Sequence, residues 1–143
     1  MNHFDFEVRI AYADTDRMGV VYYANYLVLF ERGRVEFMRA AGMRYKEMED
    51  RDGLYLPALE AQLRYLAPAR YDDLIRIRTF ITEVGGAHLN FRYEVTLPSE
   101  DNRLLATGAS RHAVVNRSWK PARLTRELLE FFKSHRESPP AGR

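Results

Sequence analysis

Alternation of apolar and polar residues marks five segments of the chain as strands. The first contains Phe4, Phe6, Val8, Ile10 and Tyr12. Successive side chains point to opposite faces of a strand, so a period of two is typical of a strand with one buried face. Four later segments are also strand-like: 59–65, 75–82, 89–97 and 104–115. Short turns at 85–86 and 98–102 separate neighbouring segments, which predicts an antiparallel meander.

A helix of about four turns is predicted between the first strand and the others. Asn25 is a suitable N-cap and Gly42 a suitable C-terminal stop. The first half of this helix is apolar almost all round, so we expect it to be buried on several sides. Gly33 costs roughly 1 kcal/mol relative to alanine, which a close approach to neighbouring backbone would justify. Thr125 is the predicted N-cap of a last helix.

These elements predict an α+β fold in which one antiparallel sheet wraps around one long central helix. A chain of 143 residues suits one domain. We expect that domain to span 1–137 and the tail 138–143 to be disordered. An open sheet leaves edge strands unpaired, and pairing across a dimer would close one of them. Structural logic therefore favours a homo-oligomer.

The composition, 46% hydrophobic and 29% charged, is that of an ordinary globular protein. The absence of cysteine excludes disulfides, thiolate zinc sites and a cysteine nucleophile. We find no signal-like N-terminus and no apolar run of the ~18 residues that a membrane span needs, so the expected compartment is the cytoplasm. The net charge is only +2 and the charges are scattered, which argues against a nucleic-acid partner.

The loop between the first strand and the long helix holds the most suggestive polar residues, Asp14 and Asp16. From their spacing alone, either carboxylate is a candidate for catalysis or for a turn in which it accepts backbone amides. Longer patterns surround them: Tyr12-x-Asp14-Thr15-Asp16, Gly19-Val20-Val21-Tyr22-x-x-x-Tyr26 and Tyr65-x-x-Pro68-Ala69-Arg70-x-Asp72-Asp73. Together these patterns resemble the 4-hydroxybenzoyl-CoA thioesterase branch of the hotdog-fold superfamily. Phe30-Glu31-Arg32-x-Arg34-x-Glu36 is similar to the short-chain acyl-CoA thioesterases associated with the Tol–Pal system.

The resemblance implies a hotdog fold, a homodimer or dimer of dimers, and hydrolysis of acyl-CoA thioesters with no metal or cofactor. The family's active carboxylate maps to Asp16. Tyr23 maps to the helix start, where a backbone N–H points at the thioester carbonyl. Tyr12 maps to a tyrosine that assists in the Tol–Pal-associated relatives. Because those relatives carry histidine at the position of Tyr23, the role expected here is that of its backbone amide.

This chemistry suits these residue types. A carboxylate can attack a thioester directly or deprotonate a water, and both routes stay open for Asp16. The first N–H groups of a helix lack intrahelical partners, and the helix dipole adds positive potential at that end. Such donors can hold the oxyanion that forms during hydrolysis.

Other interpretations of the same residues stay open. Tyr12 is equally well explained as a core aromatic, and Glu31 and Glu36 are expected to form charge pairs with nearby arginines. The basic residues Arg117, Lys120 and Arg123 form either a solvated turn or contacts to CoA phosphates.

Two other functions also remain. A dehydratase or hydratase acting on an acyl thioester would commonly use a histidine with a carboxylate, but no histidine lies between Asp16 and Asn25. A non-catalytic acyl-CoA-binding protein could use the aromatic helix start for binding alone.

Overall fold

The computed structural model describes residues 1–138. Its centre is an antiparallel sheet with strand order β1-β3-β4-β5-β2. The strands are β1 (Phe4–Arg9), β2 (Ala58–Tyr65), β3 (Leu74–Val84), β4 (His88–Leu97) and β5 (Arg103–Ala113). The helices are α1 (Asn25–Ala40), α2 (Tyr45–Glu47) and α3 (Arg126–Ser134). The predicted strands are confirmed, whereas the tail predicted at 138–143 falls, apart from Ser138, outside the described residues.

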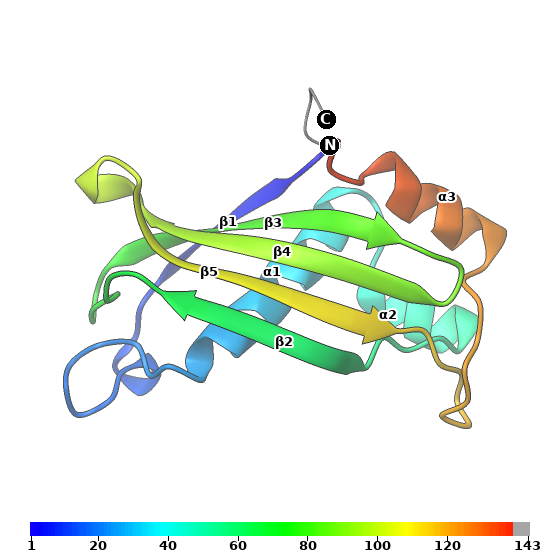
Figure 1. Ribbon diagram of the computed structural model, residues 1–143, viewed down its shortest axis with the longest axis horizontal. Helices are drawn as coiled ribbons and strands as arrows, with labels where there is room; N and C mark the ends of the chain where they lie inside the picture. The colour runs from blue at the N-terminus through cyan, green and yellow to red at the C-terminus, as the bar shows by residue number, and fades with distance from the viewer. Residues whose placement is uncertain (139–143) are drawn as a thin grey trace.

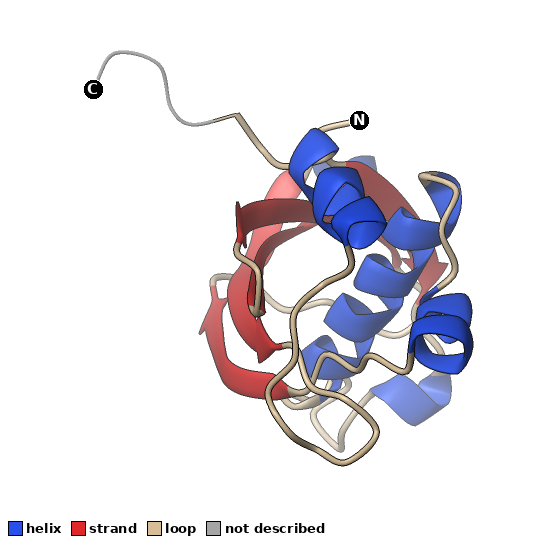
Figure 2. Ribbon diagram, turned by 90° about the vertical axis from the view of Figure 1, so that its right-hand side faces the viewer, coloured by secondary structure: helices blue, strands red, loops and turns tan. Residues whose placement is uncertain are grey.

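The sheet curves around α1, as the predicted α+β architecture requires. Figure 1 shows α1 crossing behind the strands, and Figure 2 shows the strands bending around it. Leu89, Phe91, Tyr93 and Val95 of β4 are buried while the residues between them are half-buried. The ring of Tyr93 stacks on Phe30 of α1 with ring centroids 4.2 Å apart. The core therefore lies between the helix and the inner face of the sheet.

Gly33 lets α1 come very close to β3. A Cβ atom at this position would lie 2.6 Å from Thr79 Oγ1 and 3.3 Å from Ile77 Cγ2. The predicted close approach exists, but it is to side chains of β3, not to backbone as expected. Any larger residue would push the helix off the sheet, because buried side chains are packed too tightly to make room.

The end of α1 was predicted correctly and its start was not. Gly42 has a φ of +99°, and its N–H donates to Arg39 O while Met43 N–H donates to Met38 O. These two bonds satisfy the last carbonyls of the helix in a Schellman motif. Asn25 is not the N-cap: Ala24 holds that position, and the Asn25 side-chain amide donates to Asp14 O at 2.9 Å.

The first strand is shorter than the alternation predicts. It ends at Arg9, and Tyr12 lies instead in the short 3₁₀ turn Tyr12–Asp14. The physical reason is Asp14, whose Oδ2 accepts the Ala11 N–H at 2.8 Å. That bond bends the chain back on itself, a competition with regular structure that short polar side chains often win.

Burial around α1 is one-sided in the single chain. Tyr26, Leu29 and Phe30 are buried, but Leu27 is 42% and Val28 56% exposed. The expectation that this half of the helix is buried on several sides is therefore wrong for one chain.

The last helix agrees better with prediction, since Thr125 Oγ1 accepts the Leu128 N–H as an N-cap. Among residues 1–138, we find no helix with the length and apolar character that crossing a membrane demands.

Candidate active site

The loop that carries Asp16 is a tight, well-bonded turn. Asp16 N–H donates to Val20 O, and Gly19 N–H donates to Asp16 O, both at 2.9 Å. One carboxylate oxygen, Oδ1, accepts the Met18 N–H at 2.9 Å. No donor among residues 1–138 is bonded to Oδ2. The turn thus fixes the position of a half-buried carboxylate while leaving one of its oxygens available.

Asp14 has a different task. Its side chain accepts the Ala11 N–H, and its carbonyl accepts both the Tyr22 N–H and the Asn25 side-chain amide. This residue joins the end of β1 to the start of α1. Of the two candidate carboxylates, Asp14 therefore has the turn role that the spacing left open for either.

Two backbone amides precede the helix without acceptors. Asn25 N–H donates to Tyr22 O at 2.8 Å and Leu27 N–H to Ala24 O at 3.2 Å. The N–H groups of Tyr23 and Ala24 bond to no acceptor within residues 1–138. They lie at the positive end of α1, where unsatisfied donors and the helix dipole favour a negatively charged group.

Tyr65, at the end of β2, holds this helix start in place. Its hydroxyl donates to Tyr23 O at 2.8 Å, and its ring packs edge-on against Tyr26 at 5.4 Å between centroids. The peptide unit is planar, so turning the Tyr23 carbonyl toward β2 points the Ala24 N–H the other way. Tyr65 belongs to one of the family-like patterns of the sequence, but no role was predicted for it. Its position at the start of the pattern Tyr65-x-x-Pro68 was the signal that could have identified it.

A cavity of about 340 Å³ brings the two main candidates together. Its walls are mostly apolar, and no histidine lies among the described residues that form them. It is lined by Asp16, Met18, Val20, Val21, Tyr23, Tyr26, Tyr65, Leu66, Ala67 and Pro68. Such a space suits a small apolar group presented to one carboxylate.

Tyr12 does not line this cavity. Its side chain is 78% exposed and its ring stacks on Tyr71 at 4.4 Å between centroids. It is therefore not a core aromatic, and the structure does not bring its hydroxyl to Asp16 within one chain.

Most other candidates serve in ion pairs or in turns. Glu36 pairs with Arg39 as expected, whereas Glu31 is exposed and forms no ion pair with any residue that the structure describes. Arg117 donates to Asp50 O at 2.8 Å, so its guanidinium is already engaged in the fold. His88 pairs with Glu83 at 2.9 Å on the surface.

His112 belongs to a buried chain of hydrogen bonds that the sequence did not reveal. Arg34 Nη1 lies 2.9 Å from Tyr93 Oη, which lies 2.6 Å from Ser110 Oγ; Ser110 Oγ is 2.8 Å from His112 Nε2. His112 Nδ1 is 3.0 Å from Leu56 O, which can only accept, so Nδ1 carries the proton. Burial, with the positive charge of Arg34, lowers the pKa of His112 to about 4. The neutral ring then accepts from Ser110, and Arg34, Tyr93, Ser110 and His112 each donate to the next group.

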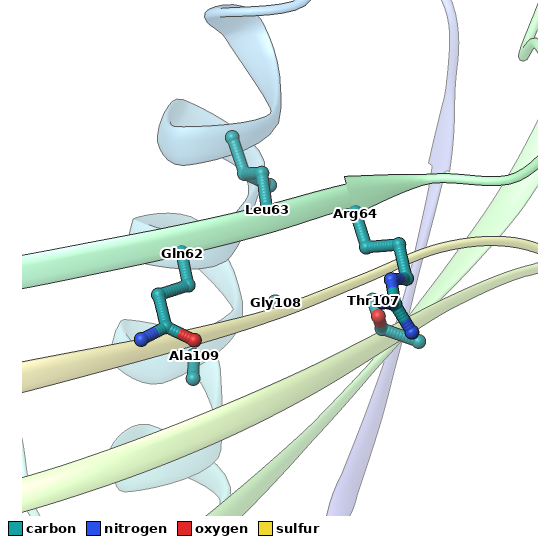
Figure 3. Close-up of a pocket in the computed structure, with 6 residues that line it drawn as sticks. All are labelled: Gln62, Leu63, Arg64, Thr107, Gly108 and Ala109. Carbon is teal, nitrogen blue, oxygen red and sulfur yellow. The ribbon is translucent and has the colours of Figure 1, made fainter.

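A larger hollow lies away from Asp16, on the outer face of β2 and β5. It measures about 540 Å³ and is lined by Gln62, Leu63, Arg64, Thr107, Gly108 and Ala109. Figure 3 shows Gln62 and Arg64 extending across β5 while Leu63 points the other way. Its polar, open surface contains no carboxylate among these lining residues, so it is not the candidate reaction site.

Comparison with known proteins gives the family. The sequence profile of the thioesterase-like superfamily matches residues 10–132. The chain belongs to this superfamily. It is 33% identical over 132 residues to the acyl-CoA thioester hydrolase YbgC of Escherichia coli O6:H1, covering 91% of this chain and 96% of that protein.

Two solved structures show the same fold. A hypothetical protein TT1821 from Thermus thermophilus superposes with a TM-score of 0.87 at 32% identity, covering 95% of this chain and 99% of that chain. The DHNA-CoA thioesterase from Staphylococcus aureus also gives a TM-score of 0.87, at 26% identity, over 94% of this chain and 91% of that chain. The hotdog fold expected from the motif is therefore confirmed.

Proposed function

We propose that this protein hydrolyses small acyl-CoA thioesters to a free acid and CoA. The observation that carries the proposal is one cavity wall that holds both the Asp16 carboxylate and the Tyr23 residue, whose N–H has no acceptor within residues 1–138. The membership of the thioesterase-like superfamily supports the reaction type. Absence of histidine from the described cavity wall removes the feature that would favour a dehydratase.

The chemistry follows from the two groups. The thioester carbonyl oxygen accepts the Tyr23 N–H, and the helix dipole stabilises the oxyanion that develops there. Asp16 either deprotonates a water that attacks the carbonyl carbon or attacks that carbon itself. In either route the C–S bond breaks, and CoA leaves as the thiolate and is protonated. After direct attack, a water then cleaves the acyl–Asp16 anhydride, which releases the acid and regenerates the carboxylate; in the other route the attacking water itself supplies the hydroxyl of the acid.

The acyl group is proposed to be a short aliphatic chain or a single aromatic ring. A cavity of about 340 Å³ with aromatic and aliphatic walls accommodates groups of that size. Both YbgC and the DHNA-CoA thioesterase are named for CoA thioesters, which supports CoA as the leaving group.

The protein is proposed to act as a homodimer or as a dimer of dimers. Edge strand β2 is exposed along almost its whole length, and apolar residues of β2, of the residue after it and of the start of α1 are 42–63% exposed: Leu59, Tyr65, Leu66, Leu27 and Val28. An unpaired, apolar edge of this kind is stable in water when a second chain covers it. A cytoplasmic location stays a prediction from the sequence.

The decisive experiment is an acyl-CoA panel from acetyl to long-chain, including benzoyl and phenylacetyl esters, read by release of free thiol. Asp16→Asn should lower kcat by about 10³-fold, in the range for loss of a catalytic base, with an unchanged melting temperature. Asp14→Asn is the matched control, because an amide oxygen still accepts the Ala11 N–H. Full activity of Asp16→Asn would refute the assignment.

A further inference from the structure

The only tryptophan in the chain is held in solvent on a rigid, strained turn. Trp119 is 66% exposed, and its φ of +63° is one that bulky residues rarely adopt. Asn116 Oδ1 accepts the N–H groups of Ser118 and Lys120, and the indole meets the Tyr55 ring edge-on at 6.3 Å. Strain that the surroundings enforce in this way points to a use for the exposed side chain.

Two cations close to Trp119 in the sequence are available to a ligand. Lys120 and Arg123 are exposed and form no ion pair with any of residues 1–138. An exposed aromatic face next to unpaired cations is the surface that a nucleotide needs, since the base stacks and the phosphates bind the cations. CoA ends in such a nucleotide, with an adenine ring and three phosphate groups.

Within one chain this surface is at the wrong end of the sheet. Figure 1 shows the segment after β5, which contains Trp119, at one end of β2 and the loop that contains Asp16 at the other. The start of β2 lies near Tyr55, and its end, Tyr65, lines the cavity. A second chain changes this arrangement, because a two-fold axis pairs identical edge strands in antiparallel fashion.

The charges on β2 select one register for that pairing. Glu60, Gln62 and Arg64 share the outer face, where Gln62 and Arg64 extend over β5 (Figure 3). Glu60 Oε2 already accepts from Arg111 of its own chain at 3.2 Å, and its Oε1 is bonded to no donor within residues 1–138. With Gln62 on the two-fold axis, Glu60 of each chain lies opposite Arg64 of the other, which adds a favourable cross-strand pair. Moving the register by two residues places Glu60 opposite Gln62 or Leu66 instead. In the charge-paired register, the start of one β2 lies beside Tyr65 and Leu66 of the other.

We infer that Trp119 and Lys120 of one subunit bind the nucleotide end of the CoA ester whose thioester lies at Asp16 of the other subunit. This inference rests on the proposed acyl-CoA substrate and dimer, and it adds the residues that recognise CoA. Each site is then complete only in the dimer: one chain supplies the carboxylate and amide, and the other supplies the base stack.

Fluorescence tests binding without relying on turnover. Trp119 is the sole tryptophan, so stacking of adenine on it should quench the emission of the Asp16→Asn protein when CoA is added. Glu60→Arg should weaken the dimer in sedimentation equilibrium and abolish the quenching, while Glu60→Arg combined with Arg64→Glu should restore both. A wild-type monomer, or quenching that persists in monomeric Glu60→Arg, would overturn the inference.

Kinetics test the assignment to the opposite subunit. Trp119→Gly suits the positive φ, and it should raise the KM for acyl-CoA about tenfold, within the range for one lost base stack, with little change in kcat. The matching acyl-N-acetylcysteamine thioester lacks a nucleotide and should show no such increase. Trp119→Phe, which keeps an aromatic face, should recover most of the affinity.

Mixed dimers, purified through two different tags, distinguish one subunit from the other. Asp16→Asn chains paired with Trp119→Gly chains leave one working Asp16, opposite an intact Trp119, so the KM should be that of the wild type. Wild-type chains paired with the Asp16→Asn/Trp119→Gly double variant should show the raised KM. The reverse result would place Trp119 in the site of its own chain. Hydrolysis of both substrates with equal effects of Trp119→Gly would refute this inference and leave the proposed function intact.

Discussion

Two polar regions of the molecule use their hydrogen-bonding groups in opposite ways. In the buried series of hydrogen bonds from Arg34 through Tyr93, Ser110 and His112 to Leu56 O, each side chain donates to the next group. At the helix start, Asp16 keeps one oxygen without a donor, and the amides of Tyr23 and Ala24 have no acceptor within residues 1–138. The first region forms its hydrogen bonds within the protein, whereas the second has donors and an acceptor that remain available to another molecule.

The difference separates groups that stabilise the fold from groups that we propose to meet a substrate. Buried polar groups are costly unless they are bonded, so a closed chain of bonds fixes the core in one arrangement. Polar groups without a protein partner at a solvent-accessible cavity cost the free protein little free energy, because water forms hydrogen bonds to them. A substrate that replaces this water forms those hydrogen bonds instead and is bound by them. The buried chain should therefore control stability, and the helix start should control turnover.

The largest effect expected in the buried chain is a loss of stability in acid. The pKa of His112 is about 4 in the folded protein and about 6.5 when unfolded, so the unfolded state binds more protons between these values. The free energy of unfolding should fall by about 3 kcal/mol as the pH drops from 7.5 to 4. Urea unfolding of wild type and His112→Asn across this range measures the contribution, which the variant should lack.

Carboxylates titrate in the same range, so the comparison with the variant is essential. Arg78 lowers the pKa of Asp5, and Arg92 lowers that of Glu137, and both pairs also weaken in acid. They are unchanged in His112→Asn and cancel in the difference. Parallel pH profiles for wild type and His112→Asn would contradict the prediction.

A smaller effect is expected from the middle of the same chain. Ser110→Ala removes the shared partner of Tyr93 and His112 and leaves both buried without it. We expect a loss of about 2 kcal/mol in the free energy of unfolding, the cost of unsatisfied buried groups, with kcat unchanged at temperatures where the variant is folded. Ser118→Ala in the exposed turn is the control. A fall in kcat with unchanged stability would show that this series of buried hydrogen bonds takes part in catalysis.

The sequence predicted these two regions unequally. Asp16 was predicted as the catalytic carboxylate from the family resemblance of its turn and the adjacent helix start, because spacing alone left a turn role equally open. The buried chain joins residues that are up to 59 positions apart, and no local pattern reports such contacts. Alternation located the strands, although it made the first one too long. The apolar character of the helix start could not decide whether Leu27 and Val28 face a core or a second chain. Tyr12 was predicted to lie in a strand because alternation gives no sign of the hydrogen bond from Ala11 N–H to Asp14, which ends the strand.

The smallest effect should come from the bond that holds the helix start. Tyr65→Phe keeps the ring against Tyr26 but removes the hydroxyl that donates to Tyr23 O. Loss of one neutral hydrogen bond is worth about 1 kcal/mol, so kcat should fall about fivefold if the bond holds the Tyr23 backbone, and with it the proposed oxyanion donor Tyr23 N–H, in place. Because Tyr65 is 48% exposed, the melting temperature should barely move. Tyr71→Phe, also half-exposed but outside the cavity, is the matched control. A raised KM with unchanged kcat would mean that Tyr65 only lines the acyl cavity, and that packing of α1 alone orients the amides.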